Sequence, residues 1–217
     1  MSDYEIKVYP NHESPKLFQN KYLEILTKTH PIVIVFMYFT IASVLIRHFY
    51  LHHSTNVSII FTFFVIGFLS WTLAEYLMHR FLYHKIGDAT FSSGIQYVFQ
   101  GIHHEYPSDK DRLVLPVIPS LFIAVVFFAL FYLLMGKLAF IFAPGFMIGY
   151  VTYMTVHYTV HKIPAPNKFN FWWKHHNIHH YQQHDRAFGV TTSLWDRVFF
   201  TMPESNRRTI KVKRIKD

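Results

Sequence analysis

Histidine is the residue with the most unusual frequency and placement in this sequence. The chain of 217 residues contains 16 histidines, more than its 13 aspartate and glutamate residues combined. Neutral imidazole is the commonest metal ligand in proteins, and it suits Fe, Zn, Cu and Ni. Ten of the histidines fall in four clusters, which are EYLMHRFLYH at 75–84, QGIHH at 100–104, HYTVH at 157–161 and HHNIHH at 175–180.

The spacing within two clusters predicts metal binding from a single face of a helix. Positions i, i+3 and i+4 share a face, so His157 and His161 point the same way, as do the histidines of HxxHH at 176–180. One metal needs only three or four such ligands, so nine or ten histidines are enough for two metals. Nitrogen-rich clusters argue against Ca or Mg, while zinc and haem remain alternatives to non-haem iron. The absence of cysteine excludes thiolate ligands and disulfides.

Long apolar helices must position these clusters. The chain is 51% hydrophobic and only 16% charged, whereas a soluble domain carries about 25% charged residues. A membrane span needs roughly 20 apolar residues, and four runs are about that long, which argues against core helices of a soluble protein. The runs are 31–46 (extendable to 51), 57–78, 113–135 and 138–156.

Charge predicts on which side of the membrane the clusters lie. The segments 1–30, 79–112 and 161–217 hold 19 of the 21 Lys and Arg residues, and the other two loops hold Arg47 and Lys137. Cytoplasmic loops carry an excess of Lys and Arg, so we expect all four clusters to be cytoplasmic. The net charge of +8 is then a feature of the membrane surface, not of nucleic acid binding.

These patterns predict an all-α integral membrane protein. It would have about four transmembrane helices and a cytoplasmic, histidine-rich helical cap. The predicted organisation is a cytoplasmic N-terminal segment (1–30), a membrane-embedded domain (31–202) and a basic C-terminal tail (203–217) near anionic headgroups.

Together the clusters resemble the histidine pattern of the membrane fatty acid hydroxylase superfamily, which is HxxxxH, HxxHH, HxxxH and HxxHH. EYLMHRFLYH, GIHHEYPSDKDRLVLP and FGVTTSLWDRVFFT are most similar to the fatty acid 2-hydroxylase branch, over roughly residues 70 to 202. The resemblance implies a non-haem di-iron oxygenase that hydroxylates a long-chain acyl lipid, a fatty acid or a sphingolipid acyl chain, at position 2. O2 is the co-substrate: one oxygen atom enters a C–H bond and the other leaves as water, which requires two electrons.

The resemblance also implies the ligands of two iron ions, with zinc as an alternative in a purified form. No catalytic residue separate from the ligands is expected. The implied ligands are His79, His84, His103, His104, His157, His161, His176, His179 and His180. Metal-bound histidines usually donate their other N–H to a carboxylate or carbonyl. The candidates for orienting the ligands in this way are Glu75, one turn before His79, together with His175 and Asp196.

The sequence departs from the family pattern at one ligand position. Gln100 stands where the second motif has its first histidine. An amide carbonyl is a weaker ligand for iron than imidazole, so Gln100 is a substituted ligand candidate, and occupancy of one metal is in question.

Electrons are expected to come from a separate protein. Many eukaryotic 2-hydroxylases carry a cytochrome b5 domain at the N-terminus, and the segment 1–30 is far too short for one. The basic cytoplasmic face is suited to dock an acidic carrier, a ferredoxin or a cytochrome b5 with its reductase. The expected partners are thus a lipid acyl substrate, the membrane and this electron donor.

Two other functions and one structural question remain open. The alternatives are a sterol or carotenoid oxidase of the same superfamily, or a non-catalytic membrane protein that binds metal or haem as an electron carrier. The structural question concerns His79 and His84, because residues five apart do not share one face of an α-helix. We therefore expect the helix to end or distort between them if both contact metal.

Overall fold

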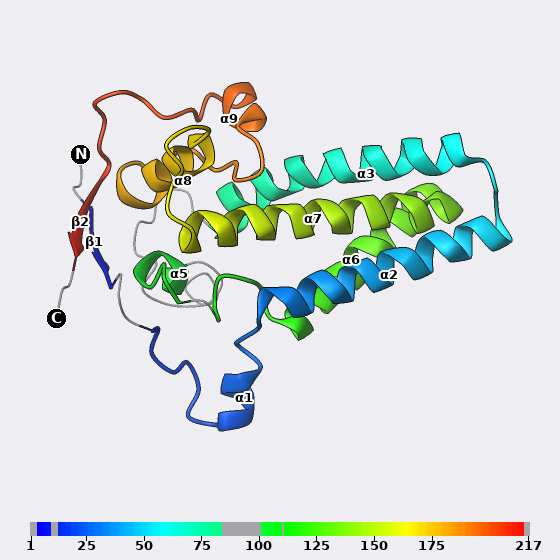
Figure 1. Ribbon diagram of the computed structural model, residues 1–217, viewed down its shortest axis with the longest axis horizontal. Coiled ribbons are helices and arrows are strands. Elements are labelled where there is room, and N and C mark those ends of the chain that lie inside the picture. Colours follow the sequence, from blue (N-terminus) through cyan, green and yellow to red (C-terminus); the bar gives the residue numbers. More distant parts are fainter. Residues whose placement is uncertain (1–3, 10–12, 84–100, 110, 215–217) are drawn as a thin grey trace. The chain divides into compact units, whose positions relative to one another are not determined.

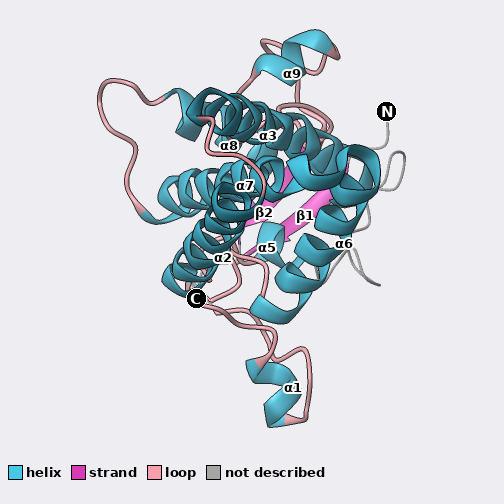
Figure 2. Cartoon of the chain, turned by 90° about the vertical axis from the view of Figure 1, so that its right-hand side faces the viewer, coloured by secondary structure: helices cyan, strands magenta, loops and turns pink. Residues whose placement is uncertain are grey.

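The computed structural model describes residues 4–9, 13–83, 101–109 and 111–214, and most of them are helical (Figure 2). The predicted all-α fold is confirmed, with the addition of two short strands. In chain order (Figure 1) the elements are β1 (Tyr4–Val8), α1 (Lys21–Ile25), α2 (Pro31–His52), α3 (Val57–Leu77), the π-helix η1 (Met78–Tyr83), α5 (Ile102–Glu105), α6 (Val117–Met135), the 3-10 helix η3 (Gly136–Leu138), α7 (Ala139–Lys162), α8 (Phe171–Tyr181), α9 (Leu194–Val198) and β2 (Ile210–Arg214).

The chain forms two compact units, each assembled from separate segments. The unit that we call the histidine unit contains Met1–Leu17, Ala74–Leu113 and Val156–Asp217, and the apolar unit contains Phe18–Leu73 and Val114–Thr155. Helices α3 and α7 contribute residues to both units. Domain boundaries at residues 30 and 202 therefore remain predictions.

Local signals set the ends of the long helices in the apolar unit. Pro31 occupies the first position of α2, where its missing N–H costs nothing. The Asn56 side chain caps α3 by accepting hydrogen bonds from the Ser58 and Ile59 amides at 3.0 and 3.3 Å. Helix α6 ends at Met135, and the next residue, Gly136, has a φ of 58°, in the left-handed region that favours glycine.

Small residues bring α3 and α7 into close contact within the apolar unit. A Cβ atom on Gly145 would lie 1.9 Å from the Phe64 carbonyl oxygen, and one on Gly67 would lie 2.1 Å from that of Phe142. Such small-residue contacts let helix backbones approach closely, as they do between membrane helices.

Aromatic contacts show that α6 and α7 fold back on each other. The Phe131 ring lies 4.7 Å from that of Phe142, and the Phe127 ring lies 4.9 Å from that of Phe146. Earlier residues of α6 thus pair with later residues of α7, which makes the two helices antiparallel. Helix α2 joins α6 through the Tyr38 hydroxyl, which donates to the Ser120 carbonyl at 2.9 Å.

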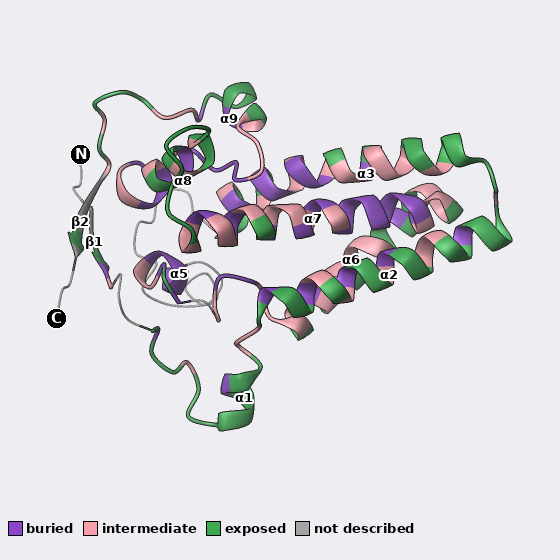
Figure 3. Cartoon of the chain, viewed as in Figure 1, coloured by how far each residue is buried: buried purple, intermediate pink, exposed green. Residues whose placement is uncertain are grey.

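Three helical stretches among the described residues are long and apolar enough to cross a membrane. They are Pro31–His52, Val57–Tyr83 and Val117–Lys162. The third stretch contains both α6 and α7, so the number of four spans remains a prediction. Only 22%, 17% and 11% of the respective apolar windows are buried. Apolar side chains therefore face outward, as they do on a surface that contacts lipid (Figure 3).

The histidine unit contains a feature that the sequence did not indicate. Strands β1 and β2 pair in parallel, from Tyr4 opposite Ile210 to Val8 opposite Arg214. The basic tail, which we expected near lipid headgroups, thus pairs with the N-terminal segment. The Asp109 carboxylate holds that segment further by accepting a hydrogen bond from the Ser14 amide at 3.1 Å.

Candidate metal centre

The histidine unit brings together eight of the nine predicted histidine ligands. The ninth predicted ligand, His84, lies outside the described residues, as does Gln100. All eight are buried except His161, which is half-buried. Four elements supply them: η1 provides His79, α5 provides His103 and His104, the end of α7 provides His157 and His161, and α8 provides His176, His179 and His180.

The eight histidines form two sets, in each of which the potential ligand nitrogens lie within 4.8 Å of one another. The five-histidine set consists of His103, His157, His161, His176 and His180, and the three-histidine set consists of His79, His104 and His179. The two sets are neighbours, because the His104 and His180 rings stack with their centroids 4.1 Å apart.

Helix geometry explains how neighbouring residues separate into different sets. Consecutive residues of a helix point roughly 100° apart, and His103 belongs to the five-histidine set while His104 belongs to the other. His176 and His180, four residues apart, stay together. His179 joins the three-histidine set, so the three histidines that we expected to point the same way are divided between the two sets. The HxxHH motif therefore serves both sets.

The five-histidine set has the properties of a metal site. The His161 and His176 Nε2 atoms lie 2.8 Å apart. Among the described residues, neither ring nitrogen of His103 or His180 has a hydrogen-bond partner, although all four atoms are buried. Buried polar atoms without partners are costly, and a bound metal would satisfy one nitrogen of each of these rings.

Backbone carbonyls orient two ligands of the three-histidine set. The His79 Nδ1 atom lies 2.6 Å from the Phe188 carbonyl oxygen, and the His179 Nδ1 atom lies 2.7 Å from that of Arg186. A ring that donates its Nδ1–H to a carbonyl keeps the lone pair of Nε2 for a metal. Both carbonyls belong to residues 186–191, which we call the strap.

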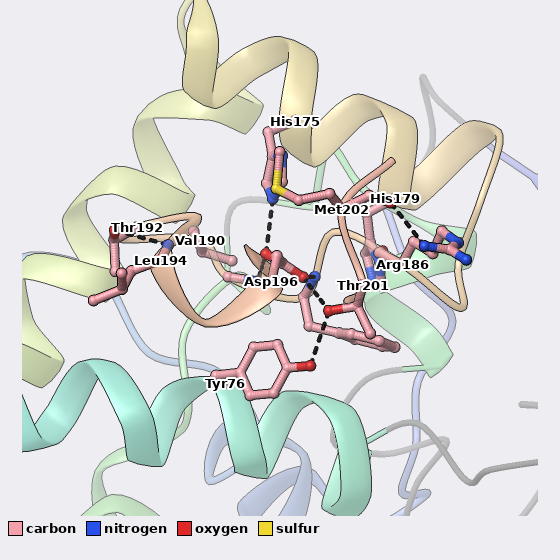
Figure 4. A network of polar contacts seen from close by, with 12 residues as sticks. Tyr76, His175, His179, Arg186, Val190, Thr192, Leu194, Asp196, Thr201 and Met202 are labelled. Carbon is pink, nitrogen blue, oxygen red and sulfur yellow. Dashed lines mark hydrogen bonds and ion pairs between the residues drawn. The ribbon is translucent and has the colours of Figure 1, made fainter. Parts of the chain in front are cut away.

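Of the three predicted orienting residues, Glu75 and Asp196 bind the strap, and His175 contacts Asp196. The Glu75 carboxylate accepts hydrogen bonds from the strap amides of Val190 and Thr191. His175 lies 3.0 Å from Asp196, measured from Nε2 to Oδ2. In Figure 4, Asp196 lies between His175 and Thr201, and Thr201 in turn contacts Tyr76.

The sequence did not point to Arg186 and Phe188, because they act through backbone carbonyls that any residue would carry. The one available signal was Gly189 in FGVTT, since a glycine among apolar residues often marks a close backbone approach.

Burial keeps the imidazoles outside the apolar helices neutral. It lowers the pKa of His103, His104, His176, His179 and His180 well below the usual range, and the nearby histidines lower it further. A neutral imidazole has a lone pair to give to a metal, whereas a protonated one has none. The donor set therefore fits a transition metal held by nitrogen ligands.

The helix that carries His79 changes geometry as the spacing predicted. Helix α3 ends at Leu77, and the π-helix η1 begins at Met78. A π-helix closes i→i+5 hydrogen bonds and is frequent at functional sites. The expected distortion thus begins at the residue before His79.

Comparison with known proteins identifies the group to which this chain is similar. The family model for fatty acid hydroxylase matches residues 64–201. A dihydroceramide fatty acyl 2-hydroxylase of Arabidopsis thaliana is 33% identical over 88% of this chain and 81% of its own length. The fatty acid 2-hydroxylase of Rattus norvegicus is 35% identical over 67% of this chain, but only 40% of that longer protein is covered.

A solved structure agrees with these relatives. The structure described as full-length scs7p, in which only the hydroxylase domain is visible, superposes with a TM-score of 0.77 and 29% identity. The match covers 93% of this chain and 78% of that chain. The agreement of sequence, fold and clustered histidines shows that this chain belongs to the fatty acid hydroxylase family.

Proposed function

We propose that this chain is a membrane-bound, two-iron oxygenase that hydroxylates the acyl chain of a fatty acid or a ceramide at carbon 2. The observation that carries the proposal is the division of eight clustered histidines into two sets, each able to hold a metal. The named activities of the relatives support a lipid acyl chain as substrate, and they do not favour a sterol or a carotenoid.

Iron bound at these sets would supply the oxidation of an unactivated C–H bond by O2, which no amino acid side chain can perform. The overall reaction consumes the C–H compound, O2, two electrons and two protons, and it yields the alcohol and water. Haem is not supported, because haem iron takes at most two axial side chains, and five imidazoles converge in one set.

The residues of this chain hold and shield the site. The histidines of both sets act as neutral nitrogen donors, and the carbonyls of Phe188 and Arg186 keep two rings in a fixed orientation. Burial of the ligands limits the access of water to the reacting centre. The apolar helices support entry of the acyl chain from the bilayer, and the predicted cytoplasmic position of the ligands is part of this proposal.

Electrons reach the site from a separate ferredoxin or cytochrome b5 with its reductase. Exposed cationic side chains in the histidine unit, among them Lys168, Lys174 and Arg197, support docking of an acidic carrier. Electron transfer that slows as ionic strength rises is the expected result, and a rate that is independent of salt would contradict this part of the proposal.

Lipid analysis tests the substrate. Cells that express the chain should contain 2-hydroxy acyl lipids, and cells that lack it or express His179→Ala should not. Equal amounts of these lipids in all three would contradict the proposal. The metal content of the purified protein, measured by mass spectrometry, tests the two-metal centre independently of the substrate.

A further inference from the structure

One end of the strap is held by a buried carboxylate from a distant part of the chain. The Glu75 Oε1 atom accepts hydrogen bonds from the amides of Val190 at 2.6 Å and Thr191 at 2.8 Å. The other carboxylate oxygen, Oε2, accepts one from the Thr191 hydroxyl. Glu75 is only 4% exposed and lies near the end of α3, so it ties the strap to this helix.

A second buried carboxylate holds the middle of the strap. The Asp196 Oδ1 atom accepts from the Phe188 amide, and its Oδ2 atom accepts from the Gly189 amide, both at 2.9 Å. A Cβ atom on Gly189 would lie 2.1 Å from the Thr192 carbonyl oxygen and 3.0 Å from Asp196 Oδ2. The strap therefore passes so close to Asp196 that only glycine fits there.

The same strap residues face the metal ligands on their other side. Phe188 donates its amide to Asp196 and accepts the Nδ1–H of His79 at its carbonyl. Arg186 accepts from His179 in the same way. By contrast, His157 of the five-histidine set is oriented by the Leu113 carbonyl at 3.3 Å, which lies outside the strap.

We infer that Glu75 and Asp196 are positioning residues that act through the strap and stabilise metal binding at the three-histidine set selectively. The inference rests on the proposed two-metal function. Loss of groups that orient metal ligands typically lowers metal affinity by about 10- to 100-fold. We expect a loss of that size at the three-histidine set, with the five-histidine set retained.

Two substitutions of Glu75 separate the hydrogen bonds from the charge. In Glu75→Gln, the amide oxygen can still accept from both strap amides, and the Thr191 hydroxyl can turn to accept from the new NH2 group. In Glu75→Leu, a side chain of similar size accepts nothing. We expect metal content after dialysis against a weak chelator to be two per chain in Glu75→Gln and one in Glu75→Leu, with faster hydrogen exchange at 188–191 only in Glu75→Leu.

Asp196→Asn has a matched control in the same unit. Asparagine replaces one acceptor oxygen with a donor, so one of the Phe188 and Gly189 amides loses its partner. Asp109 is buried to a similar degree and also accepts backbone amide hydrogen bonds, from Ser14 and Asp111. We expect Asp196→Asn to lose one metal and Asp109→Asn to keep both.

Combined variants identify the site that loses its metal. In a His79→Ala background, where the three-histidine set has lost one ligand and should already be without metal, Glu75→Leu should remove no further metal. In a His176→Ala/His180→Ala background, Glu75→Leu should remove the remaining one. The opposite pattern would overturn the inference, because the strap would then support the five-histidine set.

The remaining outcomes distinguish the inference from the proposed function. If the wild-type protein and Glu75→Leu both hold two metals with equal affinity, the strap inference is wrong and the two-metal proposal stands. If the wild-type protein holds no metal, both are wrong.

Discussion

The two histidine sets are positioned in different ways. In the three-histidine set, His79 and His179 are fixed by hydrogen bonds to strap carbonyls. In the five-histidine set, His103 and His180 have no hydrogen-bond partner at either ring nitrogen among the described residues, and the rings contact one another. Among the described residues, the three-histidine set thus has fewer ligands, two of them held by strap carbonyls, whereas the five-histidine set has more ligands, of which His157 is held by the Leu113 carbonyl. The loss of one ligand or one support should therefore affect the two sets unequally.

His179→Ala should have the largest effect on hydroxylation and metal content. A catalytic metal site typically has three protein ligands, and within the part of the chain that the structure describes this change leaves His79 and His104 of the three-histidine set. We expect hydroxylation to fall by more than about 100-fold, since ligand loss should exceed the loss of an orienting group. Metal content should fall from two to one. Product formation at the wild-type rate would show that the three-histidine set is not needed for catalysis.

Gly189→Ala should have the next largest effect, because the new methyl group would lie 2.1 Å from the Thr192 carbonyl oxygen. The strap must shift, and the carbonyls that orient His79 and His179 move with it. We expect metal affinity at the three-histidine set to fall by about 10- to 100-fold, measured by chelator competition. Gly136→Ala in the apolar unit is the control. Equal affinity in both variants would argue against a role of the strap.

His161→Ala should have a smaller effect, because four ligands remain in the five-histidine set. We expect metal affinity to fall by about tenfold, which is the lower end of the loss seen when a group that orients a metal ligand is removed. The same chelator titration measures it. A loss of metal affinity as large as that in His179→Ala would show that additional ligands do not reduce the effect of losing one.

Gln100→His should have the smallest effect. It restores the histidine of the family pattern at a position outside the described residues. If the glutamine weakens one site, metal content and turnover should rise by a few-fold at most, since the change adds one ligand to sites that already have several. Identical values for the wild-type protein and the variant would show that residue 100 has no influence on occupancy.

Much of this protein follows from local sequence patterns. Runs of apolar residues predicted the long helices, because burial in lipid or protein requires an apolar helix surface. The spacing of His157 and His161 predicted a shared helix face, and both belong to one set. The five-residue spacing after His79 predicted a helix distortion, which the structure shows as the π-helix η1.

Other features depend on contacts between segments that are far apart in the chain. Nothing in the order of residues indicated that β1 and β2 pair, since an isolated two-stranded sheet has little sequence signal. Nor did it indicate that Glu75 binds amides 115 and 116 residues away.

The sequence by itself determined which side chains have the chemistry of metal ligands, where the long apolar helices lie and to which superfamily the pattern is similar. Only the tertiary structure decided how the histidines are divided between two sets and which carbonyls orient them. The physical reason is that imidazole chemistry and helix periodicity are local properties, whereas the meeting of four helical elements and the strap depends on long-range packing. Backbone carbonyls are the same in every residue, so their role is visible only where the fold places them.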